Sequence, residues 1–77
     1  MLKELLEYLA KSLVDNPEAV HVEVVETDTT VLLELTVAKD DVGKVIGKQG
    51  RIARALRTIV KASAVRDGKR AIVEIVD

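Results

Sequence analysis

The stretch Val45–Ile52, which reads Val-Ile-Gly-Lys-Gln-Gly-Arg-Ile, carries the residue types best suited to holding a ligand. Gly47 and Gly50 bracket Lys48 and Gln49, and backbone at glycine can approach a ligand closely because no Cβ intervenes. A long amphipathic segment follows at about Arg51. The unpaired N–H groups and positive dipole end of the predicted helix would therefore point into the turn. Such a turn suits a phosphate, and the basic neighbours indicate the sugar-phosphate backbone of a nucleic acid.

The distribution of charge agrees with this interpretation, although the net charge is only −1. Residues 39–70 hold ten Lys and Arg side chains and three acids, a local balance of +7, whereas the remainder holds two bases and ten acids, a balance of −8. The chain is thus divided into a basic part and an acidic part. The basic part contains the glycine turn.

Size and composition exclude several other functions. A chain of 77 residues predicts a single domain spanning residues 1–77. There is no cysteine, no His/Cys nucleophile pair and no carboxylate cluster with metal-ligand spacing, so we expect no enzymatic activity, cofactor, metal or small-molecule substrate. Gly43-x-x-x-Gly47-Lys48 is one residue short of a nucleotide-binding P-loop, and Gln49 stands where Ser or Thr would bind magnesium.

The apolar runs are too short to span a membrane, and the acidic start does not resemble a signal peptide. We therefore expect a cytoplasmic protein without membrane contact.

The first half of the chain predicts a helix and two strands. Leucines at 2, 5, 6, 9 and 13 share one face of a helix over residues 2–14, which ends at Asn16-Pro17. Residues 20–26 and 31–37 alternate as strands. Their inward residues are Val20, Val22, Val24, Val31, Leu33, Leu35 and Val37. For both inward sets to share a face in an antiparallel pair, the residue numbers of paired positions must add up to an odd number. The loop between the strands must then contain an even number of residues, and Asp28-Thr29 as a two-residue turn meets this condition.

The second half predicts two helices and a strand. Asp40 or Asp41 can cap a short helix that runs to Ile46 and in which Gly43 relieves crowding. A longer helix over residues 51–66 ends at Asp67-Gly68. Its predicted buried stripe is Ile52, Leu56, Ile59 and Val60, and its opposite, basic stripe is Arg51, Arg54, Arg57 and Lys61. Residues 71–76 predict a strand with Val73 and Ile75 inward.

The order of elements is therefore α-β-β-α-α-β. The last two strands are joined through two helices and can be parallel. We expect an α+β fold in two layers, a three-stranded mixed sheet with three helices on one face. The opposite sheet face would carry four apolar residues that could form a dimer contact: Val25, Leu32, Ile72 and Val76.

The glycine stretch resembles the Ile-Gly-x-x-Gly-x-x-Ile signature of a KH domain, with Ile46, Gly47, Gly50 and Ala53 at those positions and Ile52 one place early. The helix–strand–strand start resembles the type II arrangement. The whole chain is similar to the small bacterial stand-alone KH proteins of the KhpA family. That resemblance implies single-stranded RNA binding, an RNA-chaperone or post-transcriptional role, a complex with a larger KhpB/Jag-type KH protein, and an influence on cell shape and cell-wall homeostasis.

The residues themselves indicate how RNA would be held. Backbone amides around Lys48, Gln49 and Gly50 would contact phosphates, in the way that KH loops clamp about four nucleotides. Gly47 shapes the turn, Lys44, Arg51 and Arg54 would continue the phosphate track, and Val45 and Ile46 would lie against bases. Two alternatives stay open: an assembly subunit whose partner carries most of the RNA affinity, as a homodimer or heterodimer, and a protein that binds single-stranded DNA.

Overall fold

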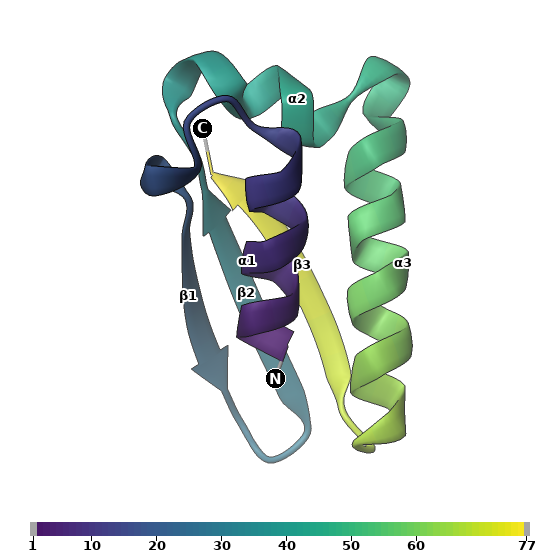
Figure 1. The fold of residues 1–77 in the computed structure, drawn as a ribbon. Helices are drawn as coiled ribbons and strands as arrows, with labels where there is room; N and C mark the ends of the chain where they lie inside the picture. Colours follow the sequence, from purple (N-terminus) through teal and green to yellow (C-terminus); the bar gives the residue numbers. More distant parts are fainter. Residues whose placement is uncertain (1, 77) are drawn as a thin grey trace.

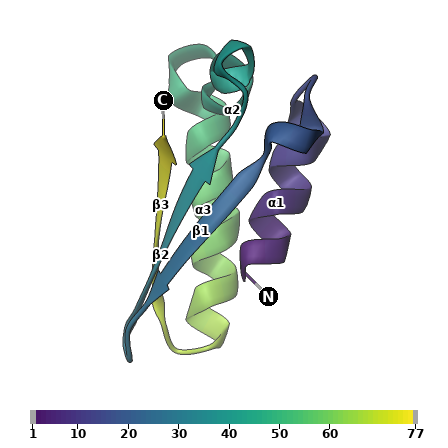
Figure 2. The ribbon, with the colours of Figure 1, turned by 90° about the vertical axis from the view of Figure 1, so that its left-hand side faces the viewer.

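The computed structural model describes residues 2–76 and arranges them in the predicted order. The helices are α1 (Leu2–Leu13), α2 (Val42–Ile46) and α3 (Arg51–Arg66), and the strands are β1 (His21–Glu26), β2 (Thr30–Thr36) and β3 (Arg70–Val76). Single 3₁₀ turns lie at Pro17–Ala19, Lys39–Asp41 and Lys48–Gly50. Helices α1 and α3 cover one face of the sheet, α2 lies at one end of the molecule, and the opposite sheet face is uncovered (Figures 1 and 2). The predicted α+β fold is confirmed.

The register of the sheet confirms the prediction that paired residue numbers in the first two strands add up to an odd number. Strand β2 lies in the middle, antiparallel to β1 and parallel to β3. Val22 pairs with Leu35 and Glu26 with Val31, so the paired β1 and β2 positions sum to 57, an odd number. The Thr27 N–H donates to the Thr30 carbonyl at 2.8 Å, which leaves Asp28-Thr29 as the two-residue loop. One face of both strands is thereby directed at the helices.

The core lies between the sheet and the helices, and its largest fully buried side chains are Leu6, Leu33, Leu35, Val22, Val45 and Val60. One prediction of burial was wrong. Ile59 is 42% exposed, because α3 packs through a narrow stripe of Ala53, Leu56, Val60 and Ala64 and Ile59 lies on its flank. Val24 faces the helices as predicted, paired with the buried Leu33, but it is 36% exposed because it sits on the edge strand β1, beside the hollow at the start of α1.

Helix α3 ends as predicted. Gly68 has φ +71°, the left-handed conformation that glycine adopts without strain. The Gly68 N–H donates to the Val65 carbonyl and the Lys69 N–H to the Ala64 carbonyl, both at 3.0 Å. These two bonds satisfy the last carbonyls of the helix and turn the chain into β3.

Asp41 precedes α2 but does not cap it, which corrects the prediction. Its side chain makes no bond to the helix start and is 2% exposed. Its carboxylate instead accepts the N–H groups of Asp15, at 3.2 Å, and Asn16, at 3.0 Å, and lies 3.5 Å from the Lys44 ammonium. Asp41 therefore ties the loop after α1 to the segment that leads into the glycine turn.

These contacts set the charge state of Asp41. Burial alone would raise the pKa of this carboxyl, but the amides of Asp15 and Asn16 and the charge of Lys44 outweigh burial and hold the pKa below its usual value. A group whose pKa is lowered by folding stabilises the fold above its unfolded pKa of about 3.9 and loses that contribution as pH falls through the folded value.

We predict that Asp41→Asn lowers the thermal unfolding midpoint at pH 7, because asparagine has one acceptor oxygen for two amide donors. The difference from the wild type should begin to narrow when the pH falls below about 4, where the carboxyl of the unfolded chain takes up a proton, and should narrow further as the pH falls through the lowered folded pKa. Thermal melts followed by circular dichroism between pH 7 and pH 3 measure both quantities. A difference that stays constant over this range would contradict the assignment.

Candidate nucleic-acid interface

The turn between α2 and α3 has three of its four residues at positive φ. These are Gly47 (φ +76°), Gln49 (φ +58°) and Gly50 (φ +74°). The Gly47 N–H donates to the Gly43 carbonyl at 2.9 Å, and the Gly50 N–H donates to the Gly47 carbonyl at 3.1 Å. Within residues 2–76, the amides of Lys48 and Gln49 make no hydrogen bond, and both residues are exposed. Two neighbouring donors are thus available at the start of a helix, an arrangement that suits an anion.

The two glycines of the turn are needed for different reasons. A Cβ on Gly47 would lie 2.6 Å from Ile52 Cγ1 and 2.9 Å from the Ile52 nitrogen, closer than real Cβ atoms come. A Cβ on Gly50 would meet nothing within 4 Å, so only the left-handed backbone favours glycine there. Gly47 therefore lets the turn pack onto the first turn of α3.

Arg54 braces the turn from α3. Its Nη2 donates to the carbonyl of Gln49 at 2.9 Å, which fixes the one non-glycine residue at positive φ. Local hydrogen bonds of this kind help to hold strained backbone. The sequence placed Arg54 on a phosphate track, and the structure adds this second contact.

The predicted basic stripe of α3 points in more than one direction. Arg57 is half-buried, and its Nε donates to the carbonyl of Val73 in β3 at 3.2 Å. Arg51 instead lines an apolar hollow between α1 and α3, together with Leu9, Leu13 and Ile52. Lys48 in the turn and Arg51 and Arg54 beside it are all exposed, whereas Arg57 belongs to the α3–β3 contact.

Three predictions about α2 need correction or refinement. Val45 is 0% exposed and belongs to the core, so it cannot lie against a base; Ile46 is half-buried and remains on the surface. A Cβ on Gly43 would meet nothing within 4 Å, so this glycine relieves no crowding. Lys44 pairs with Asp15 at 3.2 Å, and the hydrogen bond to Asp15 is the main cause that raises the pKa of Lys44.

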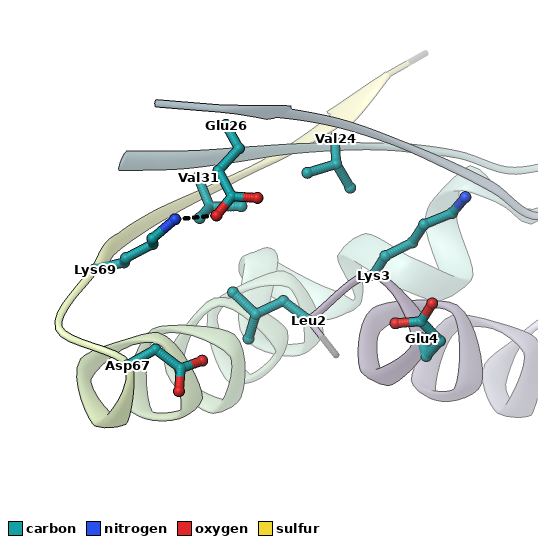
Figure 3. Close-up of a pocket in the computed structure, with 8 residues that line it drawn as sticks. All are labelled: Leu2, Lys3, Glu4, Val24, Glu26, Val31, Asp67 and Lys69. Carbon is teal, nitrogen blue, oxygen red and sulfur yellow. Dashed lines mark hydrogen bonds and ion pairs between the residues drawn. The ribbon is translucent and has the colours of Figure 1, made fainter. Parts of the chain in front are cut away.

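A second hollow lies at the other end of α3 and is less suited to a nucleic acid (Figure 3). Leu2, Val24 and Val31 form its apolar part, and Lys69 forms an ion pair with Glu26 there. Lys3, Glu4 and Asp67 complete its lining, so both signs of charge are mixed. The 16 residues of α3 separate this hollow from the glycine turn by about 24 Å.

Other classes of site find little support in the described part of the chain. Residues 2–76 contain no group of three or more His, Cys, Asp or Glu side chains placed to hold a metal ion. Among the helices of these residues, none has both the length and the apolar character needed to cross a membrane.

A family model and individual relatives point to the same protein family. Residues 3–75 match the family model for the KH domain of KhpA and KhpB. RNA-binding protein KhpA of Clostridium perfringens is 57% identical over 75 residues, covering 97% of this chain and 100% of the relative. RNA-binding protein KhpA of Chlamydia trachomatis is 47% identical over 76 residues, covering 99% of this chain and 97% of the relative.

Among solved structures, the chain is similar to Era in a crystal structure with MgGDPNP and nucleotides 1506–1542 of 16S ribosomal RNA, with a TM-score of 0.72. The match covers 96% of this chain but 28% of that Era chain, and sequence identity is 16%. This likeness concerns the fold alone.

We predict that Gly47→Ala is more destabilising than Gly50→Ala. Alanine at position 50 incurs the left-handed backbone penalty, about 1–2 kcal/mol. Alanine at position 47 adds the clash with Ile52, bringing the loss in free energy of unfolding to about 3 kcal/mol. Urea denaturation of the two variants measures the difference, and equal losses would contradict the packing assigned to Gly47.

Proposed function

The chain belongs to the KH-domain family of KhpA and KhpB, and from this premise we propose that it binds single-stranded RNA through the turn Gly47–Gly50. One observation carries the proposal: two adjacent amides, those of Lys48 and Gln49, make no hydrogen bond within residues 2–76 and stand at the beginning of α3 in an exposed turn. The similar proteins of Clostridium perfringens and Chlamydia trachomatis are named as RNA-binding proteins, which supports the choice of ligand.

In this mechanism, the two amides donate to the oxygens of one phosphate and the Lys48 ammonium adds charge. Arg51 and Arg54, on the first turn of α3, extend the contact to the next phosphates, so that the loop clamps about four nucleotides. Bases pass over aliphatic surface, with Ile46 as the remaining candidate of the two predicted. Tyr8 is the only aromatic residue of the chain, so no stacking platform contributes, and affinity should be modest and strongly dependent on salt.

The cellular role that we propose comes from the family resemblance. A non-enzymatic cytoplasmic protein would act as an RNA chaperone or post-transcriptional regulator, linked to cell shape and cell-wall homeostasis. It would use neither cofactor nor metal. The single domain of residues 1–77 would supply the whole RNA contact.

A second candidate function, an assembly subunit, is favoured by the uncovered sheet face. Val25, Leu32 and Ile72 pair in register across the three strands, and Val25 is 55% exposed. The adjacent row consists of three glutamates in register, Glu23, Glu34 and Glu74. This row repels phosphates, so the face suits a protein: a second copy or a larger KhpB/Jag-type protein that carries most of the RNA affinity.

We predict that Lys48→Asp combined with Gln49→Asp reduces RNA affinity at least tenfold, because two carboxylates repel the phosphate from the turn. Aspartate tolerates the left-handed backbone at position 49, so the fold should survive. Fluorescence anisotropy with a labelled single-stranded RNA measures affinity, and thermal melting checks the fold.

The matched control is Lys61→Asp combined with Ala62→Asp, which changes the charge equally at two exposed positions further along α3. This control should weaken RNA binding much less than the turn variant. Equal losses would assign the effect to net charge instead of the turn. If a complex of the turn variant with its protein partner bound RNA as tightly as the wild-type complex, the partner would carry the RNA affinity, and the assembly-subunit function would be favoured.

RNA and single-stranded DNA share the phosphate that the turn would recognise, so the sugar must decide between them. We predict that an RNA oligonucleotide displaces labelled RNA more effectively than a DNA oligonucleotide of matched sequence. Equal competition would favour a general single-strand binder.

A further inference from the structure

The ammonium group of Lys44 lies between two carboxylates of different character. Its Nζ is 3.2 Å from Asp15 Oδ2 and 3.5 Å from Asp41 Oδ1. Asp41 is buried and accepts two backbone N–H groups, so it is fixed in place. The side chain of Asp15 is 82% exposed and has Lys44 as its ion-pair partner. One of the two anions around Lys44 is therefore structural, and the other can be exchanged.

Lys44 is close enough to the turn to meet the same RNA strand. It lies three residues before Gly47 on α2, a helical rise of about 4.5 Å. The Lys44 side chain is 44% exposed, and a lysine ammonium has three donors on a flexible stem. A phosphate oxygen could thus replace the Asp15 carboxylate while the contact to Asp41 remains.

We propose that Asp15 occupies a phosphate position at Lys44 in the free protein and competes with RNA for that ammonium. The inference rests on the proposed RNA-binding function and adds a second phosphate subsite to the one at the turn. The carboxylate of Asp15 stands in for the phosphodiester oxygens. When RNA binds, Lys44 exchanges one anion for another, so this contact contributes less to affinity than an unpaired lysine would.

Asp15→Asn tests the competition without removing the contacts of the loop, because Asp41 accepts the backbone N–H of residue 15 and not its side chain. RNA affinity at low salt should increase about threefold, the scale of an exposed ion pair. The slope of log affinity against log salt should become steeper by up to about 0.7, since the RNA phosphate neutralised by Lys44 then releases its condensed cation and no carboxylate is left unpaired. Anisotropy titrations with labelled oligouridine at several salt concentrations give both values.

Two further variants make the result specific to Lys44. Glu18→Gln removes an equal charge from an exposed residue nearby that makes no ion pair within residues 2–76, and it should increase affinity less than Asp15→Asn. In a Lys44→Gln background, Asp15→Asn should produce no more gain than Glu18→Gln. Asp15→Asn should lower the thermal unfolding midpoint only slightly, through the loss of one exposed ion pair, and a large drop would show that the variant disturbs the fold.

The inference is overturned if Asp15→Asn and Glu18→Gln have equal effects, or if the gain persists without Lys44. These outcomes are distinct from failure of the proposed function. If wild-type protein and the Lys48/Gln49 variant bind oligouridine equally, the turn is not the site, whatever Asp15 does. If only the turn variant loses binding and Asp15→Asn changes nothing, the turn stands and the competition at Lys44 is refuted.

Discussion

The packing of Gly47 against Ile52 is the constraint on which the candidate interface depends. With no Cβ at position 47, the chain can leave α2 at positive φ, and Gly47 can pack directly against Ile52 in the first turn of α3. Because the backbone leaves the helical conformation at Gly47 and Gln49, the amides of Lys48 and Gln49 join no helix ladder, and they make no hydrogen bond within the described residues. The guanidinium of Arg54 donates a hydrogen bond to the Gln49 carbonyl. These contacts hold the turn on both sides of its free donors, and donors that are already in place can recognise an anion without a large ordering cost.

Charge divides the surface into two parts with different uses. The turn and the first part of α3 are basic, whereas the uncovered sheet face carries a row of three glutamates beside a row of three apolar residues. Phosphate is attracted to the first and repelled by the second. RNA and a protein partner could therefore bind at the same time, and the two candidate functions differ in which chain carries most of the RNA affinity.

Much of the fold followed from the sequence because its patterns are local. The alternation of apolar and polar residues in 20–26 and 31–37 predicted the strands. The requirement that both apolar sets share one face, together with a two-residue turn, predicted how the strands pair, and Gly68 predicted the end of α3. Contacts between segments far apart in the sequence could not be predicted in the same way. The sequence suggested Asp40 or Asp41 as a helix cap, but the carboxylate of Asp41 accepts hydrogen bonds from amides that lie 25 and 26 residues away. A helical wheel also cannot show how wide the buried stripe is, so Ile59 was placed in the core.

The site was predicted in part for the same reason. The glycine spacing located the turn, and the helix start located its free donors. Val45 was misplaced because a five-residue helix shows too little periodicity to separate its buried face from its exposed face. Nothing near Lys44 or Asp15 in the sequence reveals that they pair, since their proximity depends on how α1 ends beside α2.

The most direct measurement is a titration of ¹⁵N-labelled protein with short oligouridine, followed by amide chemical shifts. If the turn holds a phosphate, the largest shifts should occur at the amides of Lys48 and Gln49, with smaller shifts along the first turn of α3. Unchanged amides at Lys48 and Gln49, with RNA-dependent shifts confined to other elements, would contradict the account.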